Sequence, residues 1–226
     1  MLTKEHYNKL ITEQPWIKMQ QHFDSLGNEV VDPIAQLDIN TNDWIQFTID
    51  NFDNAQQKWE QPKSHYTGQA NEWASINNLL GRNKHNTFEL NYGMLGDSNE
   101  QLKDLLGKEN IQKLNVDPSS ILIRLIVKMP GHGIAWHQDD ASSYKIKFPH
   151  LNLDGFNKRN SDGELKRLWW SVDSWRDGHA FQISKTVLTH WRAGEVYHIP
   201  WGQGHASTNF GYCPQYTVSF TGLIYD

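Results

Sequence analysis

The sequence contains very little cysteine and no long apolar run. Its 226 residues include one cysteine, Cys213, so an internal disulfide is excluded and the composition fits a reducing compartment. No apolar run approaches the roughly 20 residues of a transmembrane helix, and the mean hydropathy is −0.69. Residues 1–10 lack the apolar stretch of a signal peptide. We therefore expect a cytoplasmic protein that does not associate with membranes.

Positive charge is also scarce. The formal net charge is −5 and the isoelectric point lies near 6.1, which argues against a general binder of the nucleic-acid backbone. Basic residues cluster at Lys158–Arg159 and Lys166–Arg167, and a solvated loop explains these pairs better than a nucleic-acid site. The composition thus gives no strong nucleic-acid signal.

The first half of the chain, residues 1–117, has mostly helical patterns. Apolar side chains recur at helical spacing at Leu102, Leu105 and Leu106, and a second stripe runs from Trp44 to Phe52. No linker is visible between the two halves, and the length suits one large domain. We therefore expect a single domain, 1–226, in which the helical half buttresses a core built from residues 118–226.

The second half consists of short β-type runs separated by turn residues such as Pro130-Gly131 and Asp177-Gly178. So many short strands in so short a segment predict a mainly β sandwich or jelly-roll-like barrel. The predicted strands are 121–129, 135–139, 145–153, 167–175, 179–183, 186–191, 195–200 and 216–225.

His137 and Asp139 are candidate metal ligands. Residues i and i+2 of a strand project to the same face, so one strand end can supply both donors. Two imidazoles and one carboxylate on one face of the metal form the ligand set of non-haem Fe(II) oxygenases. Asp140 would point away from the metal and is better read as a surface or turn carboxylate.

A His-x-Asp pair is weak evidence by itself, because the chain holds 11 histidines and a second such pair, His22 and Asp24. That pair lies in a helical pattern, where residues i and i+2 diverge by about 200° and cannot face one metal ion. We therefore expect His22 and Asp24 to be inert toward metal.

The third ligand must come from a distant strand, and His205 is the best candidate. It follows Gly202-Gln203-Gly204, a flexible approach that lets the ring lean into a barrel. The alternatives are weaker, because His198 lies just before Pro200, His190 flanks Trp191, and His150 lies close to the first pair in sequence.

The C-terminal motifs resemble those of the aspartyl/asparaginyl β-hydroxylase-like 2-oxoglutarate oxygenases and their small phage-encoded relatives. The tail of that group reads Trp-x-x-Gly-(Asp/Glu), a strand, His, Asn-x-Gly and a final strand ending in Thr-Gly. The matching residues here are Trp191–Glu195, His205, Asn209–Gly211 and Thr221-Gly222, and Ser174–Phe181 looks like the Asp-Trp-x-x-Gly-His segment of the same group.

This resemblance implies a double-stranded β-helix, a cupin-like jelly roll, that works as a dioxygenase (hydroxylase). Its cofactor would be Fe(II) held by His137, Asp139 and His205, with 2-oxoglutarate and O2 as cosubstrates. The reaction would hydroxylate a C–H bond of a peptide side chain or small molecule and release succinate and CO2. A phage-encoded protein would act in the host cytoplasm. The alternatives are a cupin-like metal- or ligand-binding barrel without turnover, and a metal-dependent hydrolase or isomerase.

One position departs from the resembled pattern. Those enzymes carry an Arg or Lys about ten residues after the distal His, which binds the distal carboxylate of 2-oxoglutarate, and a hydroxyl two residues later. Here these positions are Gln215 and Thr217. Glutamine cannot neutralise a buried carboxylate, so either another cation reaches the pocket or the cosubstrate pocket has been altered. The candidates on predicted strands are Lys147 and Arg167, followed by Arg124.

Overall fold

A computed structural model describes residues 31–51, 56–57, 89–92, 97–137 and 163–225. It also describes residues 4, 5, 8, 12, 139, 141, 144, 148–151 and 153. The His22 and Asp24 pair, Asp140 and Lys147 lie outside the described residues. No helix among the residues described is long and apolar enough to span a membrane.

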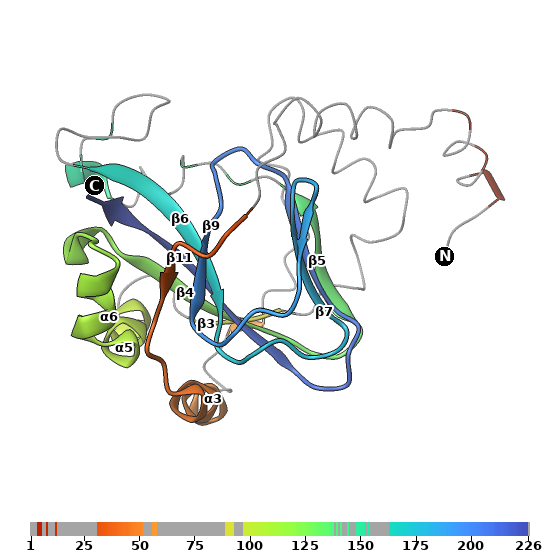
Figure 1. Ribbon diagram of the computed structural model, residues 1–226, viewed down its shortest axis with the longest axis horizontal. Coiled ribbons are helices and arrows are strands. Elements are labelled where there is room, and N and C mark those ends of the chain that lie inside the picture. Colours follow the sequence, from red (N-terminus) through yellow and green to blue (C-terminus); the bar gives the residue numbers. More distant parts are fainter. Residues whose placement is uncertain are drawn as a thin grey trace.

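Two antiparallel sheets form the core (Figure 1). The larger has the order β1-β9-β6-β11-β4-β3-β2 and the smaller the order β5-β10-β7-β8. The strands of the larger sheet are β1 (Ala35–Gln36), β2 (Gln56–Gln57), β3 (Glu89–Tyr92), β4 (Leu122–Lys128), β6 (Glu164–Ser171), β9 (Glu195–His198) and β11 (Gln215–Ile224). Those of the smaller are β5 (His132–His137), β7 (His179–Ile183), β8 (Thr186–Leu188) and β10 (His205–Asn209).

The chain crosses repeatedly between the two sheets after residue 121. Strands β4, β6, β9 and β11 belong to the larger sheet, and β5, β7, β8 and β10 belong to the smaller one. This crossing of antiparallel strands between two facing sheets is the topology of a double-stranded β-helix, or jelly roll. The predicted fold class, mainly β with a jelly-roll core, is therefore confirmed.

Helices cover the outer face of the larger sheet (Figure 1). They are α3 (Thr41–Asp50), α5 (Asp97–Leu106) and α6 (Lys108–Lys113). Trp44, Leu102 and Leu106 pack there against Val218 and Phe220 of β11, and all five side chains are buried. Side chains alternate along a strand, and Val218 and Phe220 both contact the helices. The even-numbered side chains of β11 therefore face the helices.

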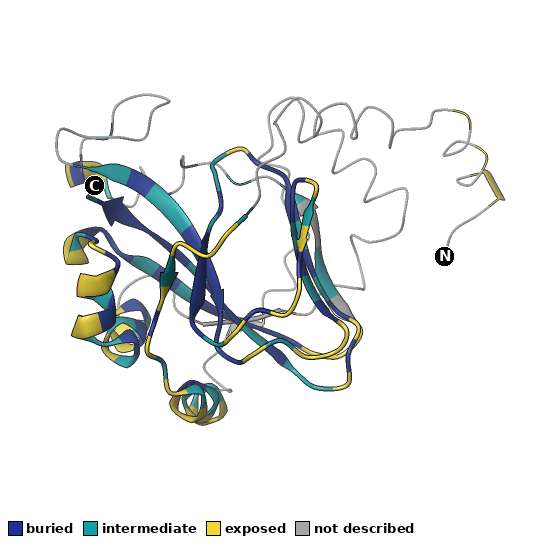
Figure 2. Ribbon diagram, viewed as in Figure 1, coloured by how far each residue is buried: buried dark blue, intermediate teal, exposed yellow. Residues whose placement is uncertain are grey.

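The odd-numbered side chains of β11 therefore face the interior between the sheets. Ser219 pairs with Trp169 of β6, whose ring stacks on Phe181 of β7 with centroids 4.3 Å apart. Phe181 belongs to the opposite sheet, so this stack joins the two sheets across the barrel. Figure 2 shows that the strands are largely buried.

The sequence located most strands of the barrel but misjudged some segments. Seven of the eight predicted segments overlap described strands. The eighth, 145–153, is wrong at Pro149–Leu151, which form a short 3-10 helix instead. Strand β10 was not predicted, because its sequence His-Ala-Ser-Thr-Asn lacks the alternating apolar residues that mark a strand. The half expected to be helical also contributes β1, β2 and β3 to the larger sheet.

Candidate metal centre

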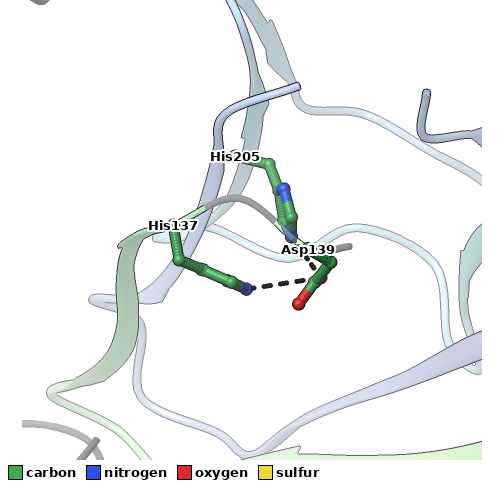
Figure 3. Close-up of side chains that lie close together, drawn as sticks. All are labelled: His137, Asp139 and His205. Carbon is green, nitrogen blue, oxygen red and sulfur yellow. Dashed lines mark ion pairs between the residues drawn. The ribbon is translucent and has the colours of Figure 1, made fainter. Parts of the chain in front are cut away.

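Strand pairing brings the two candidate histidines together. His137 is the last residue of β5, and His205 is the first residue of β10. The two residues are direct partners in the antiparallel pair formed by these strands. Their ring centroids lie 4.1 Å apart. Asp139 follows His137 at i+2, and its carboxylate faces the Nε2 atoms of both rings (Figure 3).

The donor atoms have spacings that suit one metal ion. Asp139 Oδ2 lies 3.3 Å from His205 Nε2 and 3.7 Å from His137 Nε2, and the ligand atoms all lie within 4.8 Å of one another. Donors held at right angles by bonds of about 2.1 Å are separated by about 3 Å. Two imidazoles and a carboxylate, close to that spacing, fit a facial site for a divalent transition metal. Within the described part of the chain, this is the one such group of His, Cys, Asp and Glu donors.

The His205 ring is held in the tautomer that metal binding requires. Its Nδ1 lies 3.0 Å from the Gln203 carbonyl oxygen, which only accepts hydrogen bonds, so Nδ1 carries the hydrogen. This leaves the lone pair on Nε2, which faces Asp139. Burial, with further contributions from His137 and Arg167, lowers the pKa of His205 to about 4. The imidazole is therefore neutral at neutral pH and available as a ligand.

Arg167 lies directly against these donors. Arg167 lies in β6. Its Nη1 forms an ion pair with Asp139 Oδ2, and its Nη2 donates a hydrogen bond to His205 Nε2 at 3.1 Å. Burial raises the pKa of Asp139, but Arg167, His137 and His205 outweigh it and hold that pKa well below its usual range. The carboxylate is surrounded by these groups although 37% of the side-chain surface stays exposed. A bound metal ion would use the same two atoms, so the long Arg167 side chain would have to move aside.

Arg167 was expected to reach the distal carboxylate of 2-oxoglutarate, but it is placed beside the metal donors instead. Arg124 of β4 is half-buried opposite Ser219, on the interior face of the larger sheet. The alternative third ligands do not join the donor group. The His190 ring, for example, stacks on Trp175.

A buried lysine that the sequence interpretation missed lies in the same interior. Lys128 ends β4, is 1% exposed, and is the direct strand partner of Gln215. Its Nζ donates to Thr217 Oγ1 at 3.0 Å. The sequence could have indicated Lys128, because it lies four residues after Arg124 in the same predicted strand. Side chains alternate along a strand, so both lie on one face. Gln215 and Thr217 are both fully buried.

Comparison with known proteins adds only distant similarities. No family model matches the chain, and no curated protein does. Among solved structures, it is similar to a predicted oxalate decarboxylase from Thermotoga maritima, with 10% identity, coverage of 60% of this chain and 81% of the other, and a TM-score of 0.34. It is also similar to an uncharacterized conserved protein with a double-stranded β-helix domain from Klebsiella pneumoniae, with 17% identity, 50% and 77% coverage, and a TM-score of 0.29. A cupin 2 conserved barrel domain protein from Salinispora arenicola has 12% identity, 46% and 63% coverage, and a TM-score of 0.29.

Proposed function

We propose that this protein is a non-haem Fe(II), 2-oxoglutarate-dependent oxygenase. It hydroxylates a C–H bond of a peptide side chain or small molecule and releases succinate and CO2. The observation that supports this proposal is the meeting of His137, Asp139 and His205 at one point of a double-stranded β-helix. The protein acts as one domain, in which residues 1–117 support the barrel of residues 118–226, and it works in the cytoplasm.

Each residue of the site has a defined task in this proposal. His137 and His205 would hold the ion through their Nε2 atoms, and Asp139 would hold it through one carboxylate oxygen. Bound Fe(II), together with 2-oxoglutarate and O2, supplies the oxidising power for C–H hydroxylation. The Gln203 carbonyl holds the His205 ring in place through Nδ1.

Buried aromatic side chains line the interior on one side of the donors. The Phe181 ring lies with its centroid 6.1 Å from that of His205, and the Trp169 ring stacks on Phe181. Both aromatic side chains are buried. A wall of this kind strengthens electrostatic interactions at the metal because it lowers the local dielectric constant.

A second candidate function is a cupin-like barrel that binds a metal or ligand without turnover. Two observations favour it: Gln215 stands where the resembled enzymes carry a cation, and Arg167 contacts two of the three metal donors. In this case the donors would bind a metal ion, but 2-oxoglutarate would not be consumed.

Succinate formation separates the two functions. Isotope-labelled 2-oxoglutarate is incubated in air with Fe(II), ascorbate and protein at near-stoichiometric concentration, and labelled succinate is measured by NMR. We expect slow succinate formation even without the hydroxylated substrate, and no protein-dependent formation with the Asp139→Ala variant. If wild-type protein binds Fe(II) but forms no more succinate than the variant, the oxygenase proposal is wrong and the non-catalytic barrel is favoured.

A further inference from the structure

We propose that Lys128, with Thr217 and Gln215, forms the pocket that binds the distal carboxylate of 2-oxoglutarate. The cation thus comes from β4, on the strand next to the position where the resembled enzymes carry it. This inference rests on the proposed function, because it assigns a subsite to that cosubstrate.

The strand register places the three side chains on one face. Lys128 is paired with Gln215, and Thr217 follows Gln215 at i+2. Ser219, again at i+2, is paired with Trp169, which stacks across the barrel on Phe181. Because side chains alternate along a strand, this series faces the interior that also contains the His205 ring.

The lysine side chain leans from its own strand position toward the metal end of the barrel. Its backbone is level with Gln215, but its ammonium group binds Thr217, the next interior residue along β11. Further along the same face, Thr221 is paired with Arg167, whose side chain contacts Asp139. Nζ is therefore displaced toward the metal end, so it would meet a ligand that extended from the metal into the interior.

Burial and unmet hydrogen bonding point to a ligand at this position. Gln215 is 0% exposed, and neither its Nε2 nor its Oε1 has a hydrogen-bond partner within the part of the chain that is described. Buried amides without partners are rare and indicate a missing partner such as a ligand or ordered water. A carboxylate would accept from Gln215 Nε2 and from the Lys128 ammonium, and such charge-assisted bonds are the strong ones.

The pocket is held in place by the surrounding strands. Asn209 of β10 donates through Nδ2 to the Lys128 carbonyl oxygen at 2.8 Å, so the end of β4 is tied to the smaller sheet. His179 of β7 is buried beside this region, and its Nδ1 lacks a partner within the residues described. Burial, together with the positive charge of nearby Lys128, lowers the pKa of His179 although its contact with Cys213 opposes this. A neutral His179 adds no second positive charge beside Lys128.

Arg167 fits this role less well. Its guanidinium is engaged with Asp139 and His205, at the metal end of the site. Its strand partner, Thr221, lies four residues from Thr217 along β11, which corresponds to roughly 13 Å. The distal carboxylate lies at the far end of the cosubstrate from the metal, so it needs a cation remote from the metal donors.

Calorimetric binding to full-length protein loaded with redox-inert Mn(II) tests the proposal without turnover. The ligands are 2-oxoglutarate and 2-oxobutyrate, which keeps the metal-binding keto acid but lacks the distal carboxylate. Wild-type protein should prefer 2-oxoglutarate, and Lys128→Gln should weaken its binding about 10- to 100-fold, the range for losing a hydrogen bond to a charged group. Binding of 2-oxobutyrate and of Mn(II) should stay unchanged. Lys113→Gln, at an exposed site on α6, is the matched control.

Moving the charge to the opposite strand is a sharper test. In the double variant Lys128→Gln with Gln215→Arg, the two paired positions exchange cation and amide. We expect this variant to regain most of the lost 2-oxoglutarate affinity. Gln215→Arg alone should weaken binding, because two cations then crowd one buried pocket. A merely structural role of Lys128 would not produce rescue that is specific to the dicarboxylate.

The outcomes separate this proposal from the proposed function. If Mn(II)-loaded wild-type protein binds neither keto acid, the oxygenase proposal itself fails. If it binds 2-oxoglutarate and Lys128→Gln binds it equally well, only the assignment of Lys128 is overturned. Should Lys128→Gln fail to fold, wild-type protein and Thr217→Val decide the matter. Equal wild-type affinity for the two keto acids, or no loss of 2-oxoglutarate affinity in Thr217→Val, would overturn the proposal.

Discussion

Lys128 and Gln215 are direct partners across the β4–β11 pair, and both are buried in the barrel. The resembled pattern calls for a cation at position 215, and the chain has an amide there and an ammonium group on the neighbouring strand. Adjacent strands are about 4.8 Å apart, so a long side chain can cover that displacement. A charge missing from its expected strand can therefore be supplied by the residue paired with it.

The three metal donors should be individually necessary. His137→Ala, Asp139→Ala and His205→Ala should each weaken Mn(II) binding by more than about 100-fold. Replacing a residue that only hydrogen-bonds to a metal ligand typically weakens binding about 10- to 100-fold, so the loss of a ligand itself should exceed that range. His150→Ala, an exposed histidine outside the donor group, should bind Mn(II) like the wild type. Calorimetry measures the affinities. Retained affinity in any of the three variants would remove that residue from the ligand set.

Removing Arg167 should strengthen metal binding. Its guanidinium contacts two of the donor atoms and carries the same sign of charge as the metal ion. Arg167→Met should raise Mn(II) affinity roughly 10-fold, equivalent to about 1.4 kcal/mol of competition and repulsion.

Lys166→Met is the control for Arg167→Met, because it removes the same charge from the adjacent residue, which points to the other face of β6. It should leave Mn(II) affinity nearly unchanged. Weaker binding in Arg167→Met would show instead that the arginine orients Asp139 for the metal.

The stability of metal-free protein should fall as the pH is lowered from about 6.5 toward 4. The pKa of His205 is about 4 in the fold, against 6.5 for an ordinary histidine, so the unfolded chain takes up the proton first. Stability therefore declines by up to about 1.4 kcal/mol per pH unit in this window and levels off below it.

Urea unfolding with a chelator present, repeated across this pH range, measures the effect. His205→Gln should show a shallower decline than the wild type, because the variant lacks the group that takes up the proton. Equal slopes in the two proteins would contradict the assignment of the proton to His205.

Gly178 should not tolerate a side chain. Its φ is +88°, and an added Cβ would overlap the backbone of Gly211, where the start of β7 lies close to the end of β10. Gly131 has a similar φ of +83° but open space around its Cβ position. Gly178→Ala should therefore lower the free energy of unfolding by about 1–3 kcal/mol more than Gly131→Ala. Urea unfolding of both variants measures this difference. Equal losses of unfolding free energy would mean that the backbone around Gly178 and Gly211 can move apart at little cost.

The sequence by itself determined the fold class and the candidate donors. Short β-type runs separated by turn residues after Asp117 predict a sandwich or jelly-roll-like barrel, because each run has the length and composition of a strand. The alternation of side chains along a strand places His137 and Asp139 on one side of a strand end. Both inferences depend on local spacing, which a sequence displays directly.

Only the tertiary structure decided which distant residues share the interior. The pairing of His137 with His205 and of Lys128 with Gln215 depends on strand register, which links positions that are remote in the chain. The sequence offered Arg167 as one candidate for the distal carboxylate; the fold places that guanidinium beside Asp139 and His205, and it buries Lys128 beside Gln215 and Thr217. Whether a residue occupies an odd or an even position in its strand shows which face of the sheet its side chain is on. How far along the barrel that side chain lies depends on the register with neighbouring strands, which are remote in sequence.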